Sequence, residues 1–199
     1  MSFPNRSLAM AIALTGLLAA PVLAQETAPA AAPEGTGLSM GEEAAPSAAA
    51  PYVKSTHGDW QLRCVRAKDG SDPCEIYQLL KDDKGNSVAE VTMVSLPDGQ
   101  DAAAGATIIV PLETLLPAQL TLAVDGGKAK RYPFTFCAAI GCFSRIGFTG
   151  PEVEAMQKGT KATVSVVPIM APDQVVAVDI SLKGFTEAYE AVKAERPQP

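Results

Sequence analysis

Apolar and polar residues alternate along much of the chain after residue 51, and this period of two is typical of half-buried β-strands. The alternation is clearest in five segments, at 60–64, 89–93, 120–124, 161–166 and 176–183. We expect further strands near 74–80, 106–110, 129–136 and 142–148. Asp125-Gly126-Gly127 separates two of these runs and is typical of a tight hairpin turn.

Two stretches carry helical signals instead. Pro151 opens a segment that runs to Lys158 and is followed by Gly159, the proline-first, glycine-last order of a short helix. Residues 185–192 repeat large or small apolar side chains at helical spacing. About eight or nine strands with frequent turns predict an all-β, antiparallel β-sandwich of two sheets with two short helices, and a closed β-barrel is the alternative.

The first 24 residues have the order of a secretory signal peptide. Arg6 is the only charged residue among them, and an uncharged run follows at 8–23. Small side chains occupy the first and third positions before a cleavage point between Ala24 and Gln25. Because the run is shorter than the ~20 residues of a membrane-spanning helix, we expect cleavage, export, and no transmembrane span in the mature chain.

Residues 25–51 are mainly Ala, Pro, Glu, Gly and Ser, and such a segment cannot bury enough apolar surface to offset its ordering entropy. We expect a disordered linker there and one folded domain at 52–196. The whole chain has a net charge of −6, but residues 1–51 hold one Arg and four Glu, which leaves 15 basic and 18 acidic residues in the domain. Nucleic-acid binding needs a basic surface, so we expect no nucleic-acid partner.

The four cysteines, Cys64, Cys74, Cys137 and Cys142, all lie in this domain. An even number in an exported protein predicts disulfides. Three pairings are open, and turn geometry favours Cys64–Cys74 and Cys137–Cys142, because turn-forming residues separate the first pair and Gly141 permits a tight bend in the second. The spacings C-x9-C and C-x4-C fit neither a zinc site nor a C-x-x-C redox motif.

Few residues with catalytic chemistry are present. His57 is the only histidine, and at a strand entrance it is expected to be a surface or hydrogen-bonding residue. The chain has no nucleophile-elbow sequence and no glycine-rich phosphate loop. Asp82-Asp83 is expected to be solvated, since it lacks the full set of oxygen ligands of a calcium loop. We therefore predict no catalytic residue, no metal site and no cofactor.

Aromatic residues gather near the second cysteine pair. Tyr132, Phe134 and Phe136 would share one face of the strand expected at 129–136, and Phe143 follows. Most of these rings should lie in the core, as should Trp60, the only tryptophan. Any that are exposed would form a contact patch with the cysteine bend, so Tyr132, Phe134 and Phe143 are the candidates for partner contact.

Three groups of residues resemble the invasion-associated locus B family. They are Gly58-Asp59-Trp60 followed by Cys64, Cys74 and Gln78; Pro133-Phe134-x-x-Cys137-x-x-x-Gly141-Cys142; and Ser181-Leu182-Lys183-Gly184-Phe185-x-x-Ala188. In this order they cover nearly the whole domain, at 58–188. The segment 110–127 resembles the family too, except that Glu113 and Gln119 stand where glycine is expected.

The resemblance implies an exported protein of a Gram-negative, alphaproteobacterial cell, an immunoglobulin-like β-sandwich, and a family name tied to host-cell invasion. It supplies no catalytic residue. The leading hypothesis is therefore a non-enzymatic, periplasmic or secreted module that binds an unidentified protein or surface ligand. A periplasmic structural or envelope-stress protein without a host role is the alternative, and a hydrolase that uses His57 is a third hypothesis.

Overall fold

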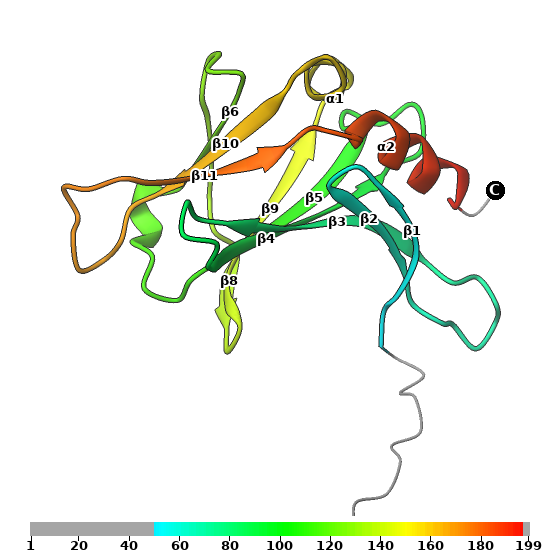
Figure 1. Ribbon diagram of the computed structural model, residues 1–199, viewed down its shortest axis with the longest axis horizontal. Helices are drawn as coiled ribbons and strands as arrows, with labels where there is room; N and C mark the ends of the chain where they lie inside the picture. The colour runs from blue at the N-terminus through cyan, green and yellow to red at the C-terminus, as the bar shows by residue number, and fades with distance from the viewer. Residues whose placement is uncertain (1–49, 197–199) are drawn as a thin grey trace, which may run out of the picture. The chain divides into compact units, whose positions relative to one another are not determined.

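The computed structural model describes residues 50–196, which form eleven β-strands, two α-helices and one short 3-10 helix (Figure 1). The expected signal peptide, its cleavage point between Ala24 and Gln25, and nearly all of the expected linker lie outside the described residues. All strand pairs are antiparallel.

The larger sheet has seven strands in the order β1-β2-β3-β4-β5-β9-β8. Their bounds are β1 Tyr52–His57, β2 Trp60–Cys64, β3 Cys74–Lys81, β4 Ser87–Ser95, β5 Ala104–Val110, β8 Phe136–Ala138 and β9 Gly141–Phe148. Each of the first four strands pairs with the next one along the chain, so most of this sheet forms through local hairpins.

The smaller sheet has four strands in the order β11-β10-β6-β7. Their bounds are β6 Leu120–Val124, β7 Lys130–Tyr132, β10 Lys161–Val166 and β11 Val176–Ser181. The helices are η1 Leu116–Ala118, α1 Gly150–Lys158 and α2 Phe185–Ala194. Because both sheets are open, with two edge strands each, the β-sandwich prediction is confirmed and the alternative of a closed barrel is wrong.

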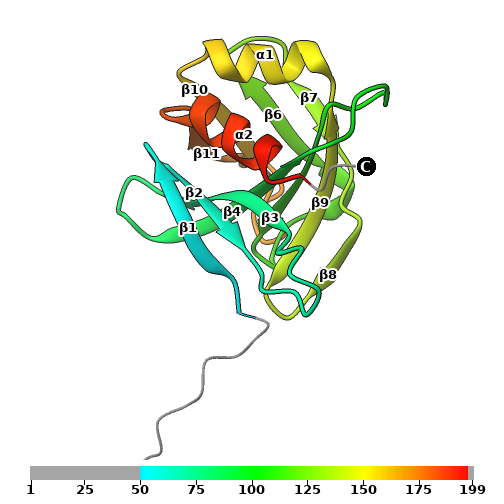
Figure 2. The ribbon, with the colours of Figure 1, turned by 90° about the vertical axis from the view of Figure 1, so that its right-hand side faces the viewer.

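The core lies between the inner faces of the two sheets and under α2. Every second residue of β2 and β5 is buried, as the alternation predicts. Helix α2 packs against β1, β2, β3 and β4 and lies beside α1 (Figure 2). Its Phe185 ring meets the Trp60 ring edge-on, with 5.4 Å between centroids, and both side chains are almost completely buried. Side chains of this size each contribute about 2–3 kcal/mol through burial.

The prediction of one continuous strand at 129–136 is wrong, because the chain changes sheets within this range. Strand β7 ends at Tyr132 in the smaller sheet, and β8 begins at Phe136 in the larger one. Pro133 has no N–H to continue a ladder. Tyr132 and Phe136 therefore do not share a strand face. The sequence also did not predict β1, since its exposed Val53 and polar neighbours hide the alternation.

Two of the three groups that resemble the known family meet at one seam. The Trp60 Nε1–H donates to the Ser181 carbonyl oxygen at 2.8 Å. The buried Gln78 amide donates to that same oxygen at 3.0 Å and accepts from the Ser181 N–H at 2.8 Å. These residues therefore hold the end of β11 against the larger sheet, so their role is to fix the fold.

Gln119 carries local backbone strain. Its φ of +61° and ψ of +162° fall in a region that is almost restricted to glycine and costs other residues about 1–3 kcal/mol. This is one of the two positions where the family resemblance leads us to expect glycine, and the strained backbone supplies the physical reason. The residue ends the loop that carries the chain from β5 to β6.

We expect Gln119→Gly to raise the free energy of unfolding by about 1 kcal/mol, because strain relief exceeds the added entropy of the unfolded chain. Urea unfolding measures it. Gln174→Gly is the matched control, in an exposed loop where the backbone has no positive φ, and it should lower stability by up to about 1 kcal/mol. If Gln119→Gly and Gln174→Gly lowered the free energy of unfolding equally, the backbone at Gln119 would not be strained.

Candidate functional site

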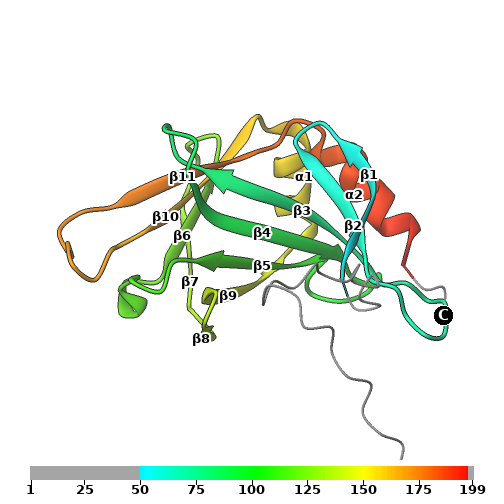
Figure 3. The same cartoon turned by 60° about the horizontal axis from the view of Figure 1, so that its bottom comes forward.

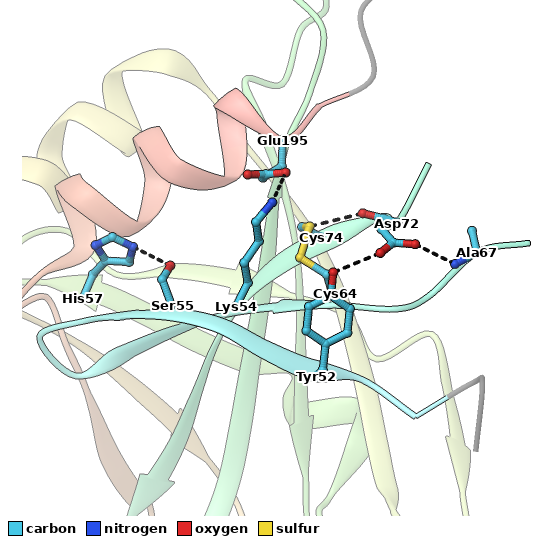
Figure 4. The surroundings of a disulfide bond; sticks show 9 residues. All are labelled: Tyr52, Lys54, Ser55, His57, Cys64, Ala67, Asp72, Cys74 and Glu195. Carbon is cyan, nitrogen blue, oxygen red and sulfur yellow. Dashed lines mark hydrogen bonds and ion pairs between the residues drawn. A yellow bond between two sulfur atoms is a disulfide. The ribbon is translucent and has the colours of Figure 1, made fainter. Parts of the chain in front are cut away.

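The first disulfide links Cys64 at the end of β2 to Cys74 at the start of β3, which are direct cross-strand partners (Figure 4). Next to it, the Asp72 carboxylate accepts hydrogen bonds from the Ala67 N–H and the Tyr52 hydroxyl, both at 2.9 Å. Both hydrogen bonds lower the pKa of Asp72, and the bond from the Ala67 N–H has the larger effect. The polar groups here stabilise a turn.

The second disulfide joins Cys137 of β8 to Cys142 of β9, so the structure has the two sequence-local pairs. Gly141 in this bend has a φ of +147°, and a Cβ there would collide with the Val110 carbonyl oxygen. The bend exposes two apolar side chains, Phe136 at 43% and Ile140 at 72%.

The three aromatic candidates for partner contact are all partly buried. Tyr132 packs edge-on against Phe148, and its hydroxyl donates to the Glu152 carboxylate at 3.3 Å. Burial, together with that carboxylate, raises the pKa of Tyr132 to about 12. Phe134 packs against the core, and Phe143 stacks on Phe136 at 4.5 Å. Most of the surface of these three rings is therefore buried by contacts within the domain.

His57 hydrogen-bonds through Nε2 to the Ser55 hydroxyl at 2.9 Å, on the edge strand β1 (Figure 4). Among the described residues no carboxylate hydrogen-bonds its other ring nitrogen. The carboxylate of nearby Asp59 instead accepts from the Ser181 hydroxyl at 2.6 Å. The main hollows of the described domain are lined by other residues, so Ser55 and His57 do not contribute to any of them.

The Asp82 side chain is occupied by hydrogen bonds within the turn between β3 and β4. Its carboxylate accepts from the backbone N–H groups of Lys84 and Asn86 and from the Asn86 amide. The Asn86 side chain is the largest cause of its lowered pKa. Within 50–196, no group of three or more His, Cys, Asp or Glu is arranged to hold a metal ion. No helix in that range is long and apolar enough to cross a membrane.

An exposed apolar surface lies at the far end of the smaller sheet. We name it the apolar end, and it comprises Leu112, Leu116, Ile169, Met170, Val175 and Val176. Met170 is 83% exposed and Val175 is 67% exposed. These side chains come from the β5–β6 and β10–β11 loops and the start of β11. Figure 3 shows both loops, η1 included, projecting from the same end of the domain.

Backbone hydrogen bonds tie the two loops together. The Leu115 N–H donates to the Val167 carbonyl at 2.7 Å, and the Ile169 N–H donates to the Glu113 carbonyl at 2.8 Å. Thr114 forms a bridge with Pro168, and its buried hydroxyl donates to the Pro111 carbonyl at 2.7 Å. The apolar side chains are thus presented on a fixed backbone, which is the arrangement a binding surface needs.

An apolar groove of about 190 Å³ opens between the sheets beside the apolar end. Its lining includes Val88 and Ala89 of β4, Val110 of β5, and Val176 and Val178 of β11. Glu113 and Asp173 are the only charged residues at 110–118 and 167–178. The lining of the groove is therefore mostly apolar, and Glu113 is its only charged residue.

Sequence patterns did not indicate this surface. Leu112 and Met170 are far apart in the chain, and only the pairing of Thr114 with Pro168 brings their loops together. One signal was available: the run Val167-Pro168-Ile169-Met170-Ala171-Pro172 has no polar side chain and two prolines. Such a run in a loop cannot be buried as a strand and so indicates exposed apolar surface.

These features define a two-sheet antiparallel β-sandwich with two hairpin disulfides, a helix packed over one sheet and an exposed apolar end. The chain belongs to the invasion-associated locus B (IalB) protein family, whose model matches residues 60–193. The family carries the name of an invasion-associated protein and not that of an enzyme.

Individual relatives agree with this assignment. Invasion protein B homologues from two strains of Brucella abortus, 2308 and 9-941, are each 25% identical over 145 residues, which are 73% of this chain and 82% of theirs. The crystal structure of invasion associated protein b from Bartonella henselae aligns with a TM-score of 0.60 and 23% identity. That alignment covers 70% of this chain and 95% of the other, and it shows the common fold. The two disulfides and the family are compatible with an exported protein.

Proposed function

We propose that this protein is an exported, non-enzymatic module that binds a protein partner through its apolar end. The support for export is the signal-like sequence at 1–24, the acidic linker sequence that follows, and two disulfides of a kind that persist in oxidising compartments. Among residues 50–196, no carboxylate hydrogen-bonds His57 and the main hollows are lined by residues other than Ser55 and His57, which supports a non-enzymatic role.

One observation carries the binding proposal: six large apolar side chains are exposed on the start of β11 and on two loops that hydrogen bonds hold together. Exposed apolar surface is unfavourable by about 25 cal/mol per Å², and contiguous patches on exported domains are typical of protein contact sites. The bend at Cys137–Cys142 offers a smaller apolar surface, since Phe136 and Ile140 are its only large exposed apolar side chains.

The test is photo-crosslinking in living cells, with the crosslinking amino acid placed at Met170, Ile140 or Val53 in separate strains. All three side chains are exposed, at 83%, 72% and 51%. We expect a discrete protein adduct at Met170 that disappears when Ile169 is changed to lysine. An adduct at Ile140 that survives Ile169→Lys would move the contact surface to the cysteine bend. Equal labelling at all three sites would contradict a defined surface.

Export is tested on the same preparations. The chain recovered from the cell envelope or the medium should begin at Gln25 in mass spectrometry, because the signal-like segment ends at Ala24. An intact N-terminus on the recovered protein would contradict cleavage while leaving the binding proposal open to the crosslinking test. Protease added to intact cells then separates surface exposure, in which the domain is digested, from a periplasmic location, in which it is protected.

A further inference from the structure

Strand β11 differs from the other three edge strands of the sandwich. Natural edges are usually shortened, bulged or charged so that no further strand can pair with them. Strand β1 has a register irregularity and Lys54, while β7 and β8 have only three residues each. In contrast, β11 pairs continuously with β10 over six residues, Val176–Ser181, and its one charged side chain, Asp179, is paired with Lys161 of β10. It is the least protected edge in the described domain.

The unpaired backbone groups of β11 can be identified from the bonds at its end. Both the N–H and the carbonyl of Ser181 bond to the Gln78 side chain, so they point away from β10. The Lys161 carbonyl opposite accepts from the Asp125 N–H, so it points away from β11, as the same pattern requires. Backbone direction alternates along a strand. The N–H and carbonyl groups of Ala177 and Asp179 must therefore face outward too.

These outward groups are accessible. Ala177 and Asp179 are exposed, and no other described residue hydrogen-bonds their backbone groups. The Asp179 side chain is held by the Lys161 ammonium at 2.7 Å and the Thr163 hydroxyl at 2.7 Å, which lower its pKa and direct it toward β10. Ser181 is the only residue of this edge whose outward backbone groups bond to another described element. The segment with unpaired outward groups is therefore 176–179.

The side chains beside this edge form one wall of the apolar groove. Val176 and Val178 line it from β11, and Val88, Ala89 and Val110 line it from the larger sheet. Strand β11 lies against β3 and β4 in the seam near Ser181 and runs from there toward the apolar end (Figure 1). An extended chain along 176–179 would thus place every second side chain in the groove, since side chains alternate along a strand.

We propose that β11 and the groove bind an extended peptide of alternating apolar and basic residues by strand addition. This inference rests on the proposed function and names the partner chemistry. Main-chain bonds to Ala177 and Asp179 would supply affinity, and apolar side chains would fill the groove. Glu113, the only charged residue in the groove lining, favours a cationic chain. The linker sequence 25–51 has four Glu and no Lys or Arg, so it does not fit.

The direct test uses a fluorescent, end-blocked nine-residue peptide of alternating valine and lysine, titrated into the chain 25–199 and followed by anisotropy. We expect saturable binding that weakens as salt increases, because Glu113 is solvent-exposed. Two control peptides separate the contributions. Alternating valine and glutamate keeps strand propensity with the wrong charge, and methylation of every second backbone nitrogen keeps the side chains but removes the main-chain donors of one strand edge. Equal binding of either control would overturn the proposal.

Variants of the protein test whether the peptide binds along β11 and the groove. Ala177→Pro removes one outward N–H without removing a bond to β10, and Val176→Lys puts a charge into the groove. Each should weaken peptide binding about tenfold or more. Ile140→Lys is the matched control at another exposed apolar residue, and it should leave the Kd unchanged. If Ala177→Pro fails to fold in a thermal melt, Val176→Lys and the methylated peptide still decide the question.

Two outcomes separate this inference from the proposed function. If Ala177→Pro abolishes peptide binding but the crosslink at Met170 persists in cells, the apolar end binds its partner without strand addition, and the inference fails alone. If no adduct forms at Met170, the proposed function fails whatever the peptide does. A wild-type dimer that Ala177→Pro converts to a monomer would identify the occupant as a second copy, and the peptide proposal would be overturned.

Discussion

Replacing Gly184 with alanine is expected to lower the free energy of unfolding by about 3–4 kcal/mol, through left-handed backbone strain and overpacking together. Gly184 has a φ of +80°, and a Cβ there would collide with the His57 carbonyl. The neighbouring backbone cannot move aside, because Gly58 is packed equally tightly against Lys183. The Asp59 N–H also donates to the Lys183 carbonyl at 3.1 Å.

Two other glycines serve as controls in the same urea-unfolding series. Gly126 has a φ of +70° with open space around it, so Gly126→Ala should cost only the strain, about 1 kcal/mol. Gly150 has open space and no positive φ, so Gly150→Ala should change stability by less than about 0.5 kcal/mol. If Gly184→Ala lowers the free energy of unfolding no more than Gly126→Ala does, the backbone around Gly184 moves aside easily and the expected overpacking is wrong.

The seam matters because α2 begins there. Gly184 immediately precedes Phe185, which is completely buried against Trp60. The Trp60 and Gln78 side chains fix Ser181 just before this point. A shift at Gly184 would therefore disturb the last strand of the smaller sheet and the helix over the larger one together. This accounts for the large expected effect of one added methyl group.

The sequence predicted those parts of the fold whose signal is local. Strands such as β5, in which every second residue is buried, follow directly from alternation, and α1 follows from Pro151 and Gly159. The error at 129–136 arose because a run of aromatics imitates a strand, whereas Pro133 interrupts the ladder and the chain changes sheets. The family resemblance supplied what patterns could not, the assignment of the whole domain.

The candidate site was beyond local patterns for a different reason. The groove depends on how far β11 separates from β4 once Ser181 is fixed by Gln78, and no period in the sequence encodes that separation. Exposure of Tyr132 could not be predicted either, since the ring could pack inside or face solvent on the same alternation. Its contact with Phe148 and its hydrogen bond to Glu152 decide the matter only in three dimensions.

Reduction of both disulfides is expected to lower the free energy of unfolding by about 5 kcal/mol, which corresponds to about 10–20 °C in Tm for a domain of this size. The bridges span sequence separations of 10 and 5, and the chain-entropy model assigns them about 2.8 and 2.2 kcal/mol. Because domains are stable by only about 5–15 kcal/mol, the reduced form should be marginal. Thermal melts with and without reductant, and mass mapping of free thiols, measure this.

The two disulfides should contribute similar amounts to stability, but their removal should destabilise different parts of the domain. Cys64–Cys74 joins β2 to β3 beneath α2, so the double variant Cys64→Ala/Cys74→Ala should weaken protection from hydrogen exchange across β1, β2 and β3. Cys137–Cys142 holds β8, whose only strand partner is β9. The double variant Cys137→Ala/Cys142→Ala should therefore expose β8 alone and preserve binding at the apolar end. Loss of exchange protection across the whole sandwich in this second variant would contradict a local role for the bend.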